Sequence, residues 1–230
     1  MLQLSRKLTN NFRENEIFGQ ICTKFNGKMM NNNKKNIVVL ASGSGTNAEN
    51  IINFSKLDNS TFNVVSVMCN KADAYVLTRA KNHNIPSIVF SSKELKENRL
   101  TVNGHESTFT EYLGQNNIEC IILAGFLLKI PSYLIEMYKG KILNIHPALL
   151  PNYGGKGMYG EHVHQAVIAA KEKKSGITIH IADEHYDHGQ TVHQSECEIT
   201  PEDTPETLAQ KIHELERIYP TVINNFIKTI

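Results

Sequence analysis

Long apolar runs are missing from this sequence of 230 residues. The strongly apolar stretch at 121–128 spans eight residues including Gly125, whereas a helix that crosses a bilayer needs about twenty. Residues 1–35 also contain no apolar core of the kind found in secretory signals. The sequence therefore predicts neither a transmembrane helix nor any other membrane partner.

An excess of charge of either sign is missing as well. Lys and Arg total 24, Asp and Glu total 23, and the formal net charge is +1. Because the charges are so nearly balanced, there is no general electrostatic reason to bind nucleic acid or an anionic surface. We therefore expect no nucleic-acid partner, and any bound anion must be held by a local arrangement of the chain.

Cysteine is scarce, and its spacing suggests no pairing. Cys22, Cys69, Cys120 and Cys197 lie far apart, with no CxxC pair among them. Disulfide frameworks are typical of small secreted domains, so this spacing favours four free thiols in a reducing compartment. We therefore expect a cytoplasmic protein.

The first 35 residues differ in composition from the rest of the chain. They are rich in Asn and Lys and show no sustained periodicity, which is typical of a disordered or loosely attached extension. A transit peptide is an alternative that Glu14 and Glu16 weaken, and translation from Met29 or Met30 is another. We expect one folded domain at 36–230.

From residue 36 onward, strand-like and helix-like segments alternate. The patterns predict strands at 36–42, 62–69, 85–90, 118–126, 141–146, 175–183 and 190–199. They predict helices at 48–56, 72–83, 106–116, 132–140 and 160–174, and one that starts at Pro205 after the cap Thr204 and bends near Pro220. Residues 91–104 have no clear pattern and suggest a loop or an irregular helix start. The alternation predicts an α/β fold with a parallel sheet, helices on both faces, and ligands beyond the carboxyl ends of the strands.

A glycine loop follows the first predicted strand and leads into a helix. Its sequence, ASGSGTN at 41–47, lets the backbone approach a ligand and offers free N–H groups at the helix start. A dinucleotide fingerprint would need glycine at Ala48 and an acidic residue at Asn70. The loop therefore favours phosphate binding over dinucleotide binding, and a tight turn that binds nothing is the alternative.

Two polar residues close the fifth predicted strand. Asn144 and His146 are two positions apart, so they share one face of the strand at the edge where ligands bind. An amide donor and an imidazole can together polarise a carbonyl and stabilise an oxyanion. The alternative is a buried polar pair that only ties down a loop.

An acidic turn at 182–189 lies between the last two predicted strands. Its carboxylates and imidazoles are those of Asp183, Glu184, His185, Asp187 and His188. A carboxylate beside an imidazole favours the cationic ring and can accept a proton directly or through water. A solvated hairpin turn is the alternative.

Metal binding is a competing interpretation of this region, because histidines are frequent there. The histidines concerned are His162, His164, His180, His185, His188 and His193. However, no HExxH or Cys/His framework is present, and His162 and His164 would lie on different faces of a helix. We therefore expect no metal site.

Taken together, these motifs resemble one family closely, the folate-dependent phosphoribosylglycinamide formyltransferases. The matching stretches are NIVVLASGSGTN (36–47), NKADAYVLTRA (70–80), ILAGFLLKIP (122–131), ILNIHPALLPNYGGKGMYGEHVHQAV (142–167), GITIHIADEHYDHG (176–189) and the helix at 205–223. The resemblance implies a mostly parallel, seven-stranded, Rossmann-like sheet. It also implies transfer of the formyl group of 10-formyltetrahydrofolate to the glycyl amine of glycinamide ribonucleotide, giving N-formylglycinamide ribonucleotide and tetrahydrofolate in purine synthesis, by a monomer or a homodimer that needs no metal.

The resemblance also implies roles for individual residues. Asn144, His146 and Asp187 would be catalytic, and Gly45, Thr46 and Asn47 would bind the phosphate. The folate-binding residues would be Leu127, Leu128, Lys129, Ile130, Asn144, Ala182, Asp183, Glu184, His185, Tyr186 and Asp187. Glu216 would contact the ribose, although it lies one residue out of register with the family pattern.

The sequence departs from the family pattern at three further places. Leu128 stands where some relatives have a basic residue. No arginine falls where the family places a folate-contacting one, and Arg99 is the nearest candidate. The segment at 154–159 is longer and more glycine-rich than in some relatives, which suggests a mobile flap near the folate site.

Other members of the folate enzymes are less well matched. A methionyl-tRNA formyltransferase would need a further domain and a basic surface, and a formyltetrahydrofolate hydrolase would need an N-terminal regulatory domain. A sugar-nucleotide formyltransferase would lack this phosphate loop. A non-catalytic nucleotide-binding module remains the alternative outside this group, and the presence of Asn144, His146 and Asp187 together weighs against it.

Overall fold

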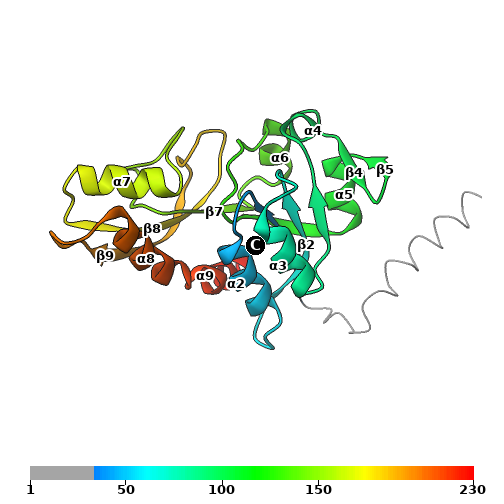
Figure 1. The fold of residues 1–230 in the computed structure, drawn as a ribbon. Coiled ribbons are helices and arrows are strands. Elements are labelled where there is room, and N and C mark those ends of the chain that lie inside the picture. Colours follow the sequence, from blue (N-terminus) through cyan, green and yellow to red (C-terminus); the bar gives the residue numbers. More distant parts are fainter. Residues whose placement is uncertain (1–33) are drawn as a thin grey trace, which may run out of the picture. The chain divides into compact units, whose positions relative to one another are not determined.

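A seven-stranded sheet runs through the computed structural model, which describes residues 34–230 (Figure 1). Its strand order is β3-β2-β1-β6-β7-β8-β9. The strands are β1 (Lys35–Ala41), β2 (Phe62–Cys69), β3 (Ser87–Val89), β6 (Ile118–Leu123), β7 (Ile142–His146), β8 (Lys174–Ile181) and β9 (Thr191–Glu198). The first five in this order pair in parallel, and β8 and β9 are antiparallel. The predicted α/β fold with a mostly parallel sheet is therefore confirmed.

Both faces of the central strands are buried. Along β1, Ile37 and Val39 pack into one hydrophobic cluster, while Val38 and Leu40 pack into a second cluster on the opposite face. This alternation follows from the two-residue period of a strand. It explains why the central strands are almost continuously apolar, whereas the edge strand β9 alternates between exposed and half-buried residues.

The helices divide between the two clusters. The first cluster includes residues of α2 (Thr46–Ser55), α3 (Tyr75–Asn82), α7 (Glu161–Ala169), α8 (Pro205–Glu216) and α9 (Tyr219–Ile227). The second includes residues of α4 (Ser92–Lys96), α5 (Phe109–Gln115) and α6 (Ser132–Met137). Helices therefore cover both faces of the sheet, as the alternating pattern predicts.

The C-terminal region differs from the single bent helix that we predicted. Thr204 caps α8 as expected, and its hydroxyl accepts a hydrogen bond from the Thr207 amide. However, α8 ends at Glu216 and a separate helix, α9, begins at Tyr219. Pro220 lies in the first turn of α9, where its missing N–H leaves no helical hydrogen bond unmade.

Residues 91–104 also form more regular structure than we predicted. Ser91 and Glu94 make a capping box that starts α4. The antiparallel strands β4 (Leu100–Val102) and β5 (His105–Ser107) form a small separate hairpin. Most residues at 91–104 are polar, so the segment has few apolar positions whose spacing could reveal such short elements.

Two predictions about the whole chain can be compared with the described residues. Cys69, Cys120 and Cys197 are free thiols, and Cys22 lies outside the described part. Among residues 34–230, no helix combines the length and apolar character that a bilayer crossing requires. Residues 1–33 of the predicted extension are not described, so its disorder remains a prediction.

Gly45 sets the start of α2. Its φ of 79° lies in the left-handed region, and a Cβ at this position would overlap the Val76 side chain of α3. The loop is also tied to α3 by the Val76 amide, which donates to the Gly43 carbonyl at 3.1 Å. Glycine at 45 therefore allows α3 to pack against the loop.

We expect Gly45→Ala to lower the free energy of unfolding by about 2 kcal/mol or more, because it adds both backbone strain and overlap with Val76. The matched control is Gly43→Ala, since a Cβ at this exposed position meets no atom within 4 Å. Urea denaturation of the two variants measures the difference. Equal stability of both variants would show that the packing of Gly45 against α3 does not matter.

Candidate active site

A cavity of about 730 Å³ opens where β1, β6 and β7 end. Its walls come from five separate segments, which are the glycine loop after β1, the residues after β6, the end of β7, the glycine-rich segment before α7 and the loop between β8 and β9. The last turn of α8 closes one corner. The cavity thus lies at the carboxyl ends of the parallel strands, where the sequence predicts a ligand.

The glycine loop is held against the segment after β6. Ser42 donates its hydroxyl to Asn70 Oδ1 at 2.5 Å and accepts a hydrogen bond from the Leu127 amide at 3.0 Å. The Ser42 amide donates to the Gly125 carbonyl at 3.0 Å. One serine therefore fixes the distance between the predicted phosphate wall and the predicted folate wall.

The N-terminus of α2 faces this cavity. Gly45, Thr46 and Asn47 line it, and the helix begins without a side-chain cap. The first backbone N–H groups of a helix have no partner within the helix, and the helix dipole is positive there. This arrangement can hold a phosphate.

Asn144, His146 and Asp187 lie together in the cavity wall. Nδ2 of Asn144 lies 3.4 Å from Oδ1 of Asp187, and Nδ1 of His146 lies 3.5 Å from the same oxygen. Asn144 and His146 sit on β7, whereas Asp187 comes from the loop after β8. The structure therefore brings Asp187 to two residues that lie more than forty positions earlier in the sequence.

Strand pairing brings a fourth residue into this group. Asn144 pairs with His180 across the antiparallel strands β7 and β8, and Asn144 Nδ2 lies 3.0 Å from His180 Nε2. His180 is 1% exposed, and its Nε2 lies 3.6 Å from Asp187 Oδ1. The sequence analysis considered His180 only as a possible metal ligand, because the pairing register of the two strands is not visible in the sequence.

The Asp187 carboxylate is kept ionised by its surroundings. Burial raises its pKa, but contact with the His180 ring, the neighbouring His146 ring and a hydrogen bond from the Gly155 amide at 2.9 Å outweigh burial. The net result is a pKa below the ordinary value for aspartate. Asp187 therefore offers a proton acceptor at neutral pH.

His146 is held in one orientation and tends to be neutral. Its Nε2 lies 2.7 Å from the Tyr153 carbonyl and therefore carries a proton that it donates there. Burial lowers the pKa of His146, and the opposing effect of Asp187 is smaller. The neighbouring carboxylate predicts a cationic ring, but in the structure the effect of burial is larger and favours the neutral form, in which Nδ1 can accept a proton.

The expected folate wall is only partly reproduced. Leu127, Leu128, Lys129, Ile130, Ala182, Asp183, His185, Tyr186 and Asp187 line the cavity. Glu184 is exposed and does not line it, because the turn directs this residue to solvent. Arg99 pairs instead with Glu97 and Glu106 outside the cavity, and within residues 34–230 the lining cations with long side chains are Lys71, Lys129 and Lys156.

Glu216 reaches the cavity despite its shifted position in the sequence. It is the last residue of α8, and it is 9% exposed. Nδ1 of His213 lies 3.0 Å from its carboxylate, and this hydrogen bond raises the pKa of His213. Because α8 ends at Glu216, this side chain can occupy the corner of the cavity although its position in the sequence is shifted by one residue from the family pattern.

His164 is a residue in the cavity wall that the sequence analysis did not identify as part of a substrate site. It is 5% exposed, and among the described residues its Nδ1 has no hydrogen-bond partner. Burial, followed by the nearby His213, lowers its pKa. His162 is exposed, so the expectation that the two histidines lie on different faces of the helix is confirmed. The available signal in the sequence was the position of His164 on the apolar face of the predicted helix, where a polar side chain is unusual.

The comparisons with known proteins agree on one family. The model of the formyl transferase family matches residues 35–223. The phosphoribosylglycinamide formyltransferase of Bacillus subtilis is 38% identical over 194 residues, which cover 84% of this chain and 95% of that protein. The Haemophilus influenzae protein of the same name is 37% identical and covers 84% of this chain and 87% of its own length. The crystal structure of phosphoribosylglycinamide formyltransferase from Bacillus halodurans superimposes with a TM-score of 0.72 at 34% identity, covering 84% of this chain and 95% of that one.

The lowered pKa of His164 predicts a pH dependence of stability. Below about pH 6.5, the unfolded imidazole takes up a proton that the folded one resists, so the unfolded state binds more protons and the free energy of unfolding falls as the pH falls. We expect His164→Asn to make this fall shallower, as measured by urea denaturation between about pH 7.5 and pH 5. The control is His162→Asn, which changes an exposed residue of the same helix. If the free energy of unfolding of His164→Asn fell as steeply with pH as that of the unchanged protein, the lowered pKa of His164 would be contradicted.

Proposed function

The chain belongs to the formyl transferase family, and on this basis we propose that it transfers the formyl group of 10-formyltetrahydrofolate to the amine of glycinamide ribonucleotide. The products are N-formylglycinamide ribonucleotide and tetrahydrofolate, as in purine synthesis. The observation that carries this proposal is one cavity that contains both the N-terminus of α2 and the group of Asn144, His146 and Asp187. A phosphate-bearing amine and a formyl donor would meet there.

The two ends of the cavity suit the two substrates. The N-terminus of α2, with Gly45, Thr46 and Asn47, would hold the phosphate, while Glu216 at another corner would accept hydrogen bonds from ribose hydroxyls. The segment at 127–130 and the loop at 182–187 would contact the folate, largely through their backbone. Binding at these remote points positions the amine against the formyl carbon.

The reaction would begin with attack of the neutral amine on the formyl carbon. Negative charge then develops on the formyl oxygen, and the Asn144 amide donates a hydrogen bond to it. Asp187 helps to remove the proton from the attacking nitrogen, directly or through water. The 3.5 Å separation of Asp187 Oδ1 and His146 Nδ1 allows this proton to pass to the imidazole.

The protonated His146 would complete the transfer. Its Nδ1–H donates to the oxyanion while the Tyr153 carbonyl holds the ring through Nε2. When the carbon–nitrogen bond to the folate breaks, the proton passes to the departing folate nitrogen, and His146 returns to the neutral form. A lowered pKa suits this role, because the ring starts neutral and gives up its proton readily. No proposed step calls for a metal.

The free thiols of Cys69, Cys120 and Cys197 support a reducing compartment such as the cytoplasm. The substrates are small molecules, and either a monomer or a homodimer is compatible with a cavity built from one chain.

The proposed reaction is tested by following the loss of 10-formyltetrahydrofolate by absorbance, with and without glycinamide ribonucleotide. We expect turnover only when the ribonucleotide is present, because its amine is the formyl acceptor. Equal turnover without the ribonucleotide would instead identify a hydrolase. Binding of both compounds with no turnover would identify a non-catalytic module.

Individual roles are tested by His146→Ala and Asp187→Asn, each of which should lower kcat by about 10²–10³ because stabilisation of the transition state is lost. Both variants should remain folded, as circular dichroism would show, since both side chains face the cavity. Asp58→Asn, at an exposed position between α2 and β2, is the matched control and should keep full activity. A variant of His146 or Asp187 with near-normal kcat would remove that residue from the mechanism.

A further inference from the structure

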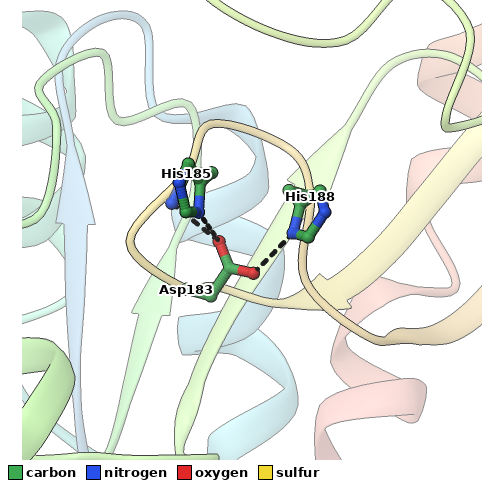
Figure 2. Close-up of side chains that lie close together, drawn as sticks. All are labelled: Asp183, His185 and His188. Carbon is green, nitrogen blue, oxygen red and sulfur yellow. Dashed lines mark hydrogen bonds and ion pairs between the residues drawn. The ribbon is translucent and has the colours of Figure 1, made fainter.

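The loop between β8 and β9 contains a second group of chemically active side chains. Figure 2 shows the imidazoles of His185 and His188 beside the carboxylate of Asp183. Nδ1 of His188 lies 2.9 Å from Asp183 Oδ2, and Nδ1 of His185 lies 3.9 Å from Asp183 Oδ1. One ligand atom from each of the three residues lies within 4.8 Å of the others. The mechanism proposed above uses neither imidazole.

These separations are close to those that a transition metal imposes. Zinc binds histidine nitrogen and carboxylate oxygen at about 2.0–2.2 Å, so two ligands of a tetrahedral ion lie about 3.4 Å apart. The two separations, 2.9 Å from His188 to one oxygen of Asp183 and 3.9 Å from His185 to the other, lie on either side of this value, and one donor atom from each residue lies within 4.8 Å of the others. Both histidines are exposed, with about three quarters of each side chain accessible (76% and 74%). Small side-chain rotations would therefore bring the three donors into ligand geometry.

The loop orients the carboxylate for this role. The His185 amide donates to Asp183 Oδ1 at 2.7 Å, which fixes the carboxylate and leaves Oδ2 directed at His188. At the end of the loop, a Cβ at Gly189 would overlap the Ile181 carbonyl, so the two ends of the loop are held close together. Such support from the backbone is typical of residues that orient a metal ligand.

We propose that Asp183, His185 and His188 form a binding site for a divalent transition metal such as Zn²⁺. Two imidazole nitrogens and one carboxylate suit zinc and its neighbours and do not suit Mg²⁺, which prefers oxygen ligands. Three protein ligands leave a coordination position for solvent. None of the three ligands belongs to the catalytic group of Asn144, His146 and Asp187, although two of them line the same cavity.

Occupation of this site would affect the folate side of the cavity. Asp183 and His185 line the cavity, whereas His188 does not. Asp187, which is adjacent to His188 in the chain, has a φ of 55° and depends on the conformation of the same loop. A metal that links Asp183 to His188 would therefore restrain the loop and compete with formyl-folate binding. This consequence for activity rests on the function proposed above, whereas metal binding itself does not.

The test begins with protein freed of metal by a chelator and titrated with ZnCl₂ in a calorimeter. We expect one zinc ion to bind the unchanged protein, with affinity at least about tenfold lower in His188→Ala because one ligand is lost. Mg²⁺ should produce no comparable binding. His105→Ala, an exposed histidine of β5, is the matched control and should bind zinc normally. Circular dichroism of each variant checks that it is folded, and His188→Gln replaces His188→Ala if the latter is not.

The second part of the test measures formyl transfer with and without zinc. Zinc should raise the KM for formyl-folate in the unchanged protein, and His188→Ala should keep basal turnover but lose this sensitivity. Equal zinc affinity in the unchanged protein and in His188→Ala would overturn the site and would place the zinc elsewhere. Absence of zinc binding to the unchanged protein would also overturn it and would leave the cluster with only a structural role, in which its hydrogen bonds stabilise the loop. A protein that binds zinc as expected but shows no turnover even without zinc would contradict the proposed function and not the metal site.

Discussion

The site depends on one carboxylate that joins two distant parts of the chain. Asp187 contacts Asn144 and His146 on β7, and its other oxygen accepts the Gly155 amide from the glycine-rich segment before α7. This carboxylate is largely buried, yet the neighbouring histidine rings and the Gly155 amide hold its pKa below the ordinary value, so it is charged where a proton must be accepted. If the loop carrying Asp187 were displaced, both the proton acceptor and one wall of the cavity would be lost together.

The sheet topology is what brings Asp187 to β7. Strand β8 pairs antiparallel with β7, and His180 near its end lies opposite Asn144, so the loop that follows β8 starts beside the strand that carries Asn144 and His146. The register that pairs Asn144 with His180 sets the side chains of the two strands against each other. On the opposite side, Tyr219 of α9 donates to the carbonyls of Leu123 and Leu143, which anchors the C-terminal helix beneath the ends of β6 and β7. The rigid part of the fold thus supports a site built from loops.

Much of the fold and part of the site follow from the sequence, for physical reasons. Buried parallel strands are apolar on both faces, and the glycine loop and the cap at Thr204 have local signatures, so these were predicted correctly. The corner with Glu216 and His164 was not fully predictable, because it depends on where α8 ends and on which face of α7 is buried. The direction of the pKa shift of His146 was predicted wrongly, since the sequence shows the neighbouring carboxylate but not the burial that outweighs it.

The central claim is that one cavity places an amine held by the N-terminus of α2 against Asn144, His146 and Asp187. The most direct measurement is a crystal structure with glycinamide ribonucleotide and an unreactive folate analogue. The account predicts the phosphate on the amides of Gly45, Thr46 and Asn47, and the amine within about 3.2 Å of a polar atom of the catalytic group, directly or through one water. A phosphate bound away from α2, or an amine remote from His146 and Asp187, would contradict it.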